Sequence, residues 1–391
     1  MHMREPSPVL LALALSMAAA VSLGITRFAY ALLLPIMRED LAWSYTLAGA
    51  MNTANALGYL VGALTAPALM RRWGVTAAVM AGAVGGSLFM VLSGFFRAAE
   101  PLLLQRLLAG VASAWLFVSG GLLTAQLAAR HAHQSGWLIG LYYGGTGWGI
   151  VASAALVPAV VAWGQPWPVA WWILALACVL ATALMTPSVR KLRLAQTQAM
   201  QTPGAPAPLP WRRFLPVLGG YGCFGIGYIG YMTFVIALLR EQGVDSQSRT
   251  VFYIALGLAV VASARIWAGL LDRYREGQAL ALLNGLLGLA TLIPVITAQL
   301  WALLLSGLLF GGVFLSVVAS TTAWVRHNLP QTQWSQGITV FTVVFAAGQV
   351  VGPTAVGSIA DRSGGLVAGL LASACVLWAG SAVALMQKPM R

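Results

Sequence analysis

Charged residues are scarce in this sequence. Only 8% of its 391 residues are Asp, Glu, Lys or Arg, whereas 59% are hydrophobic. This scarcity excludes an ordinary soluble domain, because a water-exposed surface needs far more charge. Apolar runs of about 20 residues recur along the chain, and each is long enough to cross a bilayer. The alternating pattern of a membrane β-barrel is absent. The composition therefore predicts an all-α polytopic membrane protein embedded in a lipid bilayer.

Acidic residues are the scarcest charged type, with nine Asp and Glu against 22 Lys and Arg. The resulting net charge of +13 could indicate nucleic-acid binding, but the excess of basic residues in cytoplasmic loops explains it better. Placing both termini in the cytoplasm puts most of the loop arginines and lysines on the inside. We therefore expect a multi-pass protein of the cell inner membrane that binds no nucleic acid.

Motifs of catalysis and metal binding are also missing. The sequence contains no Gly-x-Ser-x-Gly, no His-Glu-x-x-His and no phosphate-cradling Gly-rich motif. Its three cysteines lie in apolar segments, and His131 and His133 form only a His-x-His in a loop. We expect neither an enzyme nor a protein with a metal or cofactor site.

Twelve apolar segments can be drawn along the chain, and one long interruption divides them. The interruption is basic and rich in proline, which is typical of a cytoplasmic linker. We predict a six-helix half over 1–187, the linker over 188–212 and a second six-helix half over 213–391. Glycine pairs four residues apart, such as Gly145 and Gly149, predict closely packed helices. The predicted segments are 9–36, 44–70, 75–96, 101–127, 137–161, 168–187, 213–239, 250–271, 278–298, 300–324, 332–360 and 366–386.

Three arginines, Arg27, Arg106 and Arg265, fall inside apolar segments, whereas all nine acidic residues are expected at tail, loop or helix-end positions. A buried charge in a bilayer helix is costly, so by default it marks a functional site. Arginine stays charged, and its planar group meets a carboxylate with two hydrogen bonds. The imbalance predicts a small anionic substrate, bound by Arg27 with Arg265 as the second cation. For Arg106 and Arg265, a structural role is an equally good interpretation.

Polar and aromatic side chains recur at helical spacing in several segments. Such stripes face a cavity or another helix rather than lipid, and Tyr30 should share a helix face with Arg27. Hydrogen bonds between helices would explain these tyrosines and asparagines as well as substrate contact does. Beside Arg27 and Arg265, the candidates for substrate binding are Tyr30, Asn52, Asn55, Tyr59, Tyr142, Tyr228 and Gln349.

Short motifs recur along the chain: Arg106-x-x-x-Gly110, the run from Arg265 to Asp272-Arg273, and Gly352-Pro353 followed by Asp361-Arg362. They resemble motifs of the major facilitator superfamily of secondary transporters. Three further motifs, Gly24-x-x-Arg27-Phe-Ala-Tyr30, Asn55-x-x-Gly58-Tyr59 and Gly348-Gln349-x-x-Gly352-Pro353, are similar to its YbfB/YjiJ-type branch.

The resemblance implies the major facilitator fold, in which twelve transmembrane helices form two pseudo-symmetric halves. In transporters built from such repeats, the substrate site lies near the middle of the membrane and the halves rock around it. The resemblance also implies a gating or coupling role for Arg106, Asp272 and Asp361. The fifth predicted segment, 137–161, carries no Gly-Pro pair, so the drug-antiporter signature of the superfamily is not met.

The predicted function is a secondary active or facilitative transporter of a small, carboxylate-like organic anion, working by alternating access as a monomer. Because no carboxylate is embedded, co-transport of protons and exchange for a counter-substrate both stay open. The alternative is a proton-coupled efflux pump for hydrophobic, drug-like or sugar-like compounds. A membrane sensor or an intramembrane enzyme would need a soluble domain or a catalytic set, and the sequence shows neither.

Overall fold

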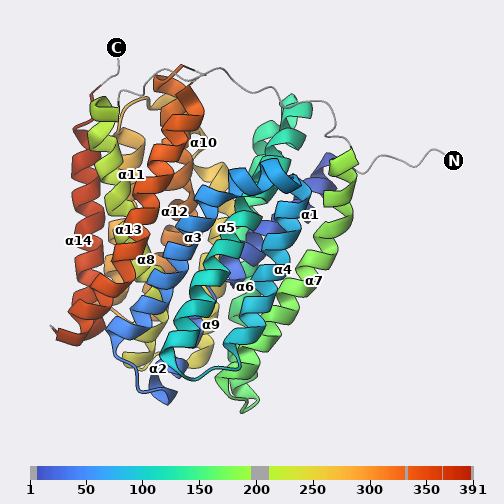
Figure 1. Cartoon of the computed structure of the whole chain (residues 1–391). Coiled ribbons are helices and arrows are strands. Elements are labelled where there is room, and N and C mark those ends of the chain that lie inside the picture. Colours follow the sequence, from blue (N-terminus) through green and yellow to red (C-terminus); the bar gives the residue numbers. More distant parts are fainter. Residues whose placement is uncertain (1–6, 195–210, 331–332, 363, 389–391) are drawn as a thin grey trace. The chain divides into compact units, whose positions relative to one another are not determined.

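The computed structural model of the chain describes residues 7–194, 211–330, 333–362 and 364–388. Within these ranges the chain forms helices and no strand (Figure 1), so the prediction of an all-α protein is confirmed for them. The helices are α1 (Pro8–Ala19), the π-helix η1 (Ala20–Ile25), α2 (Tyr30–Asp40), α3 (Tyr45–Trp73), α4 (Val75–Ser93), α5 (Ala99–Arg130), η2 (Ala132–Gln134), α6 (Ser135–Ala162), α7 (Trp167–Leu194), η3 (Trp211–Phe214), α8 (Leu215–Glu241), α9 (Ser246–Ile266), α10 (Ala268–Arg273), α11 (Gln278–Ile296), α12 (Leu300–Asn328), α13 (Trp334–Arg362) and α14 (Gly365–Leu385).

Each predicted apolar segment coincides with helical structure. Among the described residues, eleven helical stretches are long and apolar enough to cross a membrane. The segment predicted at 250–271 falls outside this group, and it divides into α9 and the short α10 at Trp267. The predicted linker begins inside α7, which continues to Leu194, and residues 195–210 of that linker lie outside the described residues.

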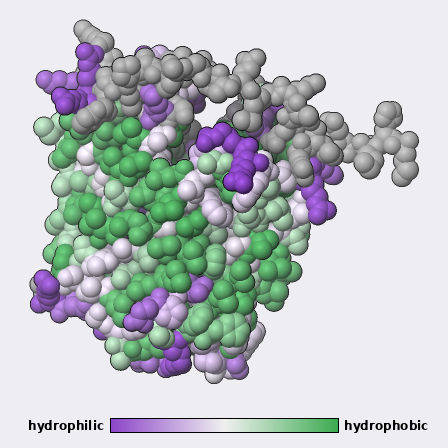
Figure 2. Space-filling view, in the orientation of Figure 1, coloured by the Kyte–Doolittle hydropathy of each residue, from purple (hydrophilic) through white to green (hydrophobic). Residues whose placement is uncertain are grey.

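Apolar side chains cover much of the surface, as a bilayer-embedded protein requires. Trp163 is 70% exposed, Leu184 is 69% exposed and Leu64 is 58% exposed. Figure 2 shows hydrophobic residues over most of the visible helical surface, with hydrophilic residues gathered near the helix ends. In water such continuous apolar patches would drive association, whereas lipid chains cover them without cost.

The contacts divide the chain into two compact units. The first comprises Met1–Ala29 and Gly58–Ala199, and the second comprises Tyr30–Leu57 and Met200–Arg391. Residues 30–57, which we call the inserted segment, therefore belong with the C-terminal helices by their contacts. This grouping differs from a simple division at the linker, and the two pseudo-symmetric halves stay a prediction.

Helices within each unit approach closely at glycines. In the first unit, a Cβ atom at Gly145 of α6 would lie 2.0 Å from the carbonyl oxygen of Ser16 in α1. In the second unit, a Cβ at Gly311 of α12 would lie 2.2 Å from the carbonyl oxygen of Leu256 in α9. Backbone oxygens cannot rotate away as a side chain can, so these positions exclude any larger residue. The predicted role of the spaced glycines in helix packing is confirmed at these contacts.

This packing predicts that a glycine-to-alanine substitution has opposite effects on stability at two positions of α6. Gly145→Ala should lower stability by about 1–3 kcal/mol, because its methyl group overlaps the α1 backbone. Gly136→Ala is the matched control and should raise stability slightly. Nothing lies within 4 Å of its Cβ position, and alanine has a higher helix propensity than glycine. Melting temperatures of the purified variants in detergent measure both effects. Equal melting temperatures would contradict the close approach of α1 and α6.

Candidate functional site

The first membrane-spanning stretch is broken at its middle. The chain leaves α1 at Ala19, passes through the π-helix Ala20–Ile25 and four turn residues, and resumes as α2 at Tyr30. The N–H groups of Thr26 and Phe28 donate to carbonyls five residues back, those of Val21 and Leu23, each at 3.0 Å. Wide turns of this kind occur frequently at functional sites. The sequence predicted one continuous segment over 9–36, so the break is a finding of the structure.

The local sequence explains the break. A Cβ at Gly24 would lie 2.5 Å from the carbonyl oxygen of Thr146 and 2.6 Å from the Cα of Gly149, so only glycine lets the wide turn rest on α6. The Thr26 hydroxyl donates to the Val21 carbonyl at 2.6 Å. A threonine hydroxyl that bonds to the backbone competes with the regular helix pattern. Gly24 and Thr26 inside an apolar run were the available sequence signals.

Arg27 lies in this break and is almost fully buried, at 2% exposed. Its guanidinium carbon lies 5.6 Å from the centre of the Tyr59 ring on α3, a cation–π contact that gains strength away from water. Because Arg27 stands outside any α-helix, the argument that it shares a helical face with Tyr30 does not apply. The structure brings together Arg27 and Tyr59, which were both predicted as site residues.

Arg106 of α5 reaches the same break. Its Nη1 atom donates to the carbonyl oxygen of Thr26 at 2.7 Å, and its guanidinium carbon lies 5.7 Å from the Trp171 ring. Arg106 is also 2% exposed. The Thr26 carbonyl belongs to the residue directly before Arg27, so the Arg106 guanidinium bonds to the turn in which Arg27 stands.

Acidic side chains keep to the ends of the helices in the part of the chain that the structure describes. None of them is buried there, and Glu276 is the half-buried one. The side chain of Asp272, predicted for gating or coupling, lies outside the described residues. The exposed acidic residues are Glu39, Asp40, Glu100, Glu241, Asp245 and Asp361.

Tyr142 lies in the first unit and forms a hydrogen bond that joins two helices. Its hydroxyl donates to the carbonyl oxygen of Phe117 at 2.6 Å, and its ring packs edge-on against Tyr143. A Cβ at Gly120 would lie 2.9 Å from the Tyr142 hydroxyl, so a small residue makes room for the bond. This hydrogen bond joins α6 to α5. It supports the interpretation that Tyr142 has a structural role between helices.

Five predicted site residues are buried in the second unit. The Tyr30 hydroxyl donates to the Ala48 carbonyl at 2.8 Å, and the Asn52 amide donates to the Thr233 hydroxyl at 2.7 Å. The Gln349 amide donates to the Tyr228 hydroxyl. Asn55 is 1% exposed. These bonds join helices to one another, which is the structural role that the sequence left open beside substrate binding.

An aromatic column runs along the second unit and was not predicted. Tyr228 is its centre, with stacked rings at 4.7 Å to Phe224, 5.6 Å to Phe345 and 6.0 Å to Phe314. Aromatic residues three and four positions apart on α8 were the visible signal, but their partners on α12 and α13 could not be paired from sequence. The column comprises Tyr221, Phe224, Tyr228, Phe310, Phe314, Phe341 and Phe345.

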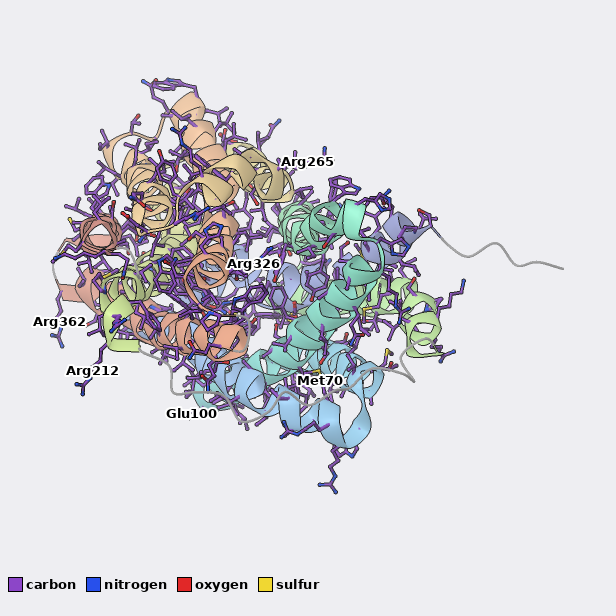
Figure 3. All side chains as sticks on the ribbon, turned by 90° about the horizontal axis from the view of Figure 1, so that it is seen from above. Met70, Glu100, Arg212, Arg265, Arg326 and Arg362 are labelled. Atoms are coloured by element: carbon purple, nitrogen blue, oxygen red, sulfur yellow. The ribbon has the colours of Figure 1, made fainter. Side chains whose placement is uncertain are left out.

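Arg265 does not share the burial of Arg27. It stands in the last turn of α9 and is exposed (Figure 3), whereas the sequence placed it inside an apolar segment. The chain leaves α9 directly afterwards at Trp267, whose indole nitrogen donates to the Gly312 carbonyl at 2.8 Å. The helix ends early here, so water or headgroups can reach the guanidinium. Substrate binding by Arg265 stays a prediction.

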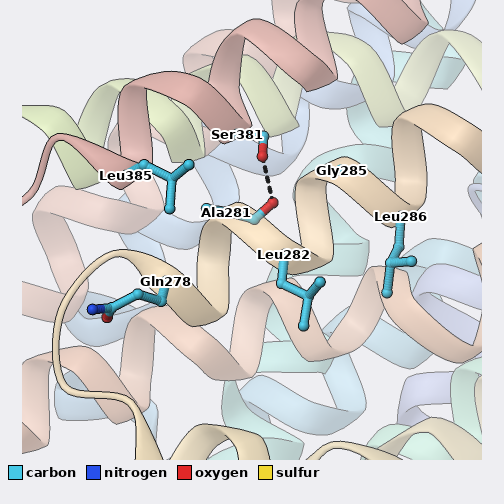
Figure 4. Close-up of a pocket in the computed structure, with 7 residues that line it drawn as sticks. All are labelled: Gln278, Ala281, Leu282, Gly285, Leu286, Ser381 and Leu385. Atoms are coloured by element: carbon cyan, nitrogen blue, oxygen red, sulfur yellow. Dashed lines mark hydrogen bonds between the residues drawn. The ribbon is translucent and has the colours of Figure 1, made fainter.

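A groove of about 340 Å³ lies between α11 and α14 in the second unit (Figure 4). Leucines dominate its lining, and the Ser381 hydroxyl on it donates to the Ala281 carbonyl at 2.6 Å. No predicted site residue lines this groove, and it contains no charged side chain. The described residues also hold no cluster of three side chains that could bind a metal ion.

A known protein family matches most of the chain. The family described as "Uncharacterised MFS-type transporter YbfB" matches residues 19–385 of the chain. The matched range includes the break in the first stretch and the helices that follow it. Among curated proteins, none matches the chain.

The bond from Arg106 to the Thr26 carbonyl gives a prediction about stability. Arg106→Lys keeps the charge but loses the planar group that contacts both Thr26 and Trp171, so stability should fall by about 1–2 kcal/mol. The exposed Arg97 is the matched control, because Arg97→Lys should change the melting temperature little. If Arg106→Lys and Arg97→Lys have the same melting temperature, the Arg106 guanidinium does not hold the break in place.

Proposed function

The chain belongs to the family of YbfB-type transporters of the major facilitator superfamily, and from this we propose that it carries a small organic anion across the membrane. Family membership makes it a multi-pass membrane protein that acts as a secondary transporter of a small molecule. The class of substrate is our proposal. So are alternating access, a monomeric state, and a location in the inner membrane with both termini cytoplasmic.

The observation that carries the proposal is the pair of buried guanidinium groups at the break in the first stretch. Arg27 and Arg106 are each 2% exposed. Burying a charge costs several kcal/mol, and a hydrogen-bonded opposite charge offsets part of that cost. Arginine bonds a carboxylate through two parallel N–H groups. A carboxylate-bearing substrate is therefore the ligand whose chemistry suits this break best.

The two arginines have different proposed roles. Arg27 stands in the turn itself, with its guanidinium carbon over the Tyr59 ring. We propose that this ring contact helps to position Arg27 for the anion. Arg106 holds the Thr26 carbonyl and so fixes the turn on which Arg27 is mounted. Loss of Arg106 should therefore weaken binding through position as well as charge.

The coupling of transport to an energy source follows from the acidic residues. None of the acidic side chains that the structure describes is buried, so a proton relay through an embedded carboxylate has no support among them. Exchange for a second anion, or entry of the proton on the substrate itself, fits this distribution. In both cases the cargo would supply the negative charge that the arginines attract.

An efflux pump for hydrophobic, drug-like or sugar-like compounds is the second candidate. The aromatic column of α8, α12 and α13 favours it, because stacked rings can accept a flat apolar or sugar-like body. A cationic compound would be repelled by the buried arginines. The two candidate functions differ in the charge of the ligand. A measurement of which ligands bind can therefore distinguish them.

A thermal-shift screen of the purified protein distinguishes the candidates. Carboxylates, sulfonates, phosphates and neutral compounds are compared, and a ligand at about one hundred times its Kd should stabilise the folded form by about 2.7 kcal/mol. We expect carboxylates to raise the melting temperature and neutral compounds to leave it unchanged. A shift with neutral compounds alone would favour the efflux pump.

Arg27→Gln tests the proposed anion contact. It should lower the affinity for the most stabilising anion by about thirtyfold or more, because a charged hydrogen-bonded contact contributes about 2–5 kcal/mol. Arg97→Gln is the control, because it removes an exposed arginine, and it should bind as the parent does. Isothermal titration measures both Kd values. Equal affinity for Arg27→Gln and the parent would remove Arg27 from the site.

A further inference from the structure

The groove between α11 and α14 opens on the surface of the second unit. Leu282 and Leu385 on its lining are 46% and 62% exposed, and Figure 4 shows Gln278 and Leu286 at its opposite ends. These ends are about two turns of α11 apart, roughly 12 Å at the rise of a helix. In a bilayer, an exposed apolar groove of this kind is in contact with the acyl chains of lipids.

Gly285 gives the groove space at its centre, because it has no side chain. A Cβ at this position would lie 3.5 Å from the hydroxyl oxygen of Ser381, and no other atom beyond the α11 backbone would come within 4 Å of it. The Ser381 hydroxyl already donates to the Ala281 carbonyl. The centre of the groove therefore accommodates hydrocarbon and offers little to a polar ligand.

One end of the groove lies where α11 begins and α14 ends. Gly277, directly before α11, packs so closely that a Cβ atom there would overlap the carbonyl oxygen of Ala384 in α14. The next residue of each helix, Gln278 and Leu385, lines the groove. The groove therefore reaches the ends of both helices, where a bound chain could continue into a polar headgroup.

Exposed basic residues gather at this end of the groove. Arg275 lies three positions before the first residue of α11, and Lys388 lies three positions after the last residue of α14; both are exposed. The Gln387 amide donates to the backbone carbonyl of Arg213 at 3.2 Å, which brings the exposed Arg213 to the same place. Glu276 is the acidic side chain described at this end, and it is half-buried. Among the described side chains here, positive charge therefore exceeds negative charge.

The charge at this end decides between a lipid and a second copy of the chain as the occupant. A two-fold dimer places the same surface of both copies face to face. With its axis along the membrane normal, such a dimer would bring the two basic ends together, and like charges repel. Anionic phospholipids, by contrast, attract Lys and Arg side chains at the membrane surface. A single anionic lipid suits both the apolar groove and its basic end.

We propose that this groove binds an anionic phospholipid, with one acyl chain along α11 and the phosphate beside Arg275 and Lys388. Charge-assisted hydrogen bonds from these side chains hold the phosphate. The acyl chain leaves one apolar environment for another, so it gains no hydrophobic energy and contributes packing contacts instead. The headgroup therefore supplies the selectivity. The lipid is a partner of the protein and not its cargo, so the site does not depend on the anion proposed above.

Native mass spectrometry of the purified, delipidated full-length protein measures this binding. Phosphatidylglycerol is compared with phosphatidylcholine that carries the same acyl chains, and the Kd of the most tightly bound lipid is determined for each. A Lys or Arg beside an anionic headgroup contributes about a factor of five to affinity. With two such residues at the groove, phosphatidylglycerol should bind at least about tenfold more tightly than phosphatidylcholine.

Two kinds of variant test the two parts of the site. Arg275→Gln and Lys388→Gln should each weaken phosphatidylglycerol binding by about fivefold. Arg362→Gln is their control, because it removes an exposed arginine beside the start of α14, roughly 30 Å from the basic end. Gly285→Leu places a side chain in the groove and should weaken binding of both lipids by about tenfold or more, because the lost acyl-chain contacts add up. Gly136→Leu, at an open position of α6, should bind both lipids as the parent does.

Equal Kd values for the two lipids in the parent, or a parental Kd in Gly285→Leu, would overturn the proposal. A dimer in the same spectra that Gly285→Leu abolishes would assign the groove to a second copy instead. Should Gly285→Leu fail to elute as a folded species in gel filtration, the exposed Arg275→Gln and Lys388→Gln decide the question, and parental Kd values in both would reject the lipid site.

Arg27→Gln separates the lipid site from the proposed anion site. It should bind phosphatidylglycerol as the parent does, because Arg27 belongs to the first unit and the groove to the second. A loss of phosphatidylglycerol binding in Arg27→Gln, with Arg275→Gln at the parental Kd, would place the lipid at Arg27 and reject the groove.

Discussion

The hydrogen bond from the Arg106 guanidinium to the Thr26 carbonyl is the interaction on which the candidate site depends. A π-turn widens the first stretch until the Thr26 carbonyl faces α5 instead of the next turn of its own helix. Gly24 makes the widening possible, because a side chain there would collide with the backbone of α6. The Arg106 guanidinium then donates to this buried carbonyl and keeps its own charge at the break. The turn in which Arg27 stands is thus fixed from two sides.

Aromatic rings are part of the electrostatic balance of this site. Tyr59 lies against Arg27 and Trp171 lies against Arg106, so each guanidinium meets the negative face of a π-system. These contacts moderate the cost of burial, and the proposed anion would add a full negative charge to them. The same balance explains why arginine, with a flat and weakly hydrated head, suits both positions better than lysine.

The sequence predicted the positions of the helices well and the bonds between them poorly. Long apolar runs limit where a chain can cross a bilayer, so the predicted segments coincide with the helices. The break at Thr26 depends on how Gly24 meets α6, and that contact joins residues distant in sequence. Arg265 shows the converse difficulty, because its apolar neighbours indicated burial whereas α9 ends beside it. The Tyr142 hydroxyl donates to a backbone carbonyl of another helix, and the Asp361 carboxylate accepts from backbone N–H groups of another helix. No sequence motif shows which backbone groups of another helix will be within reach.

The π-helix η1 constrains the number of residues in the first stretch. Residues 20–25 contain one residue more per turn than a regular helix would need. Each residue turns an α-helix by about 100°, so a single deletion there would rotate α1 relative to Gly24, which rests on α6. Leu15 and Ala18, now 0% exposed, would then face outward, and Gly145 would no longer lie under Ser16. Natural variation in this stretch should therefore be confined to substitutions, with insertions and deletions excluded between Ala19 and Tyr30.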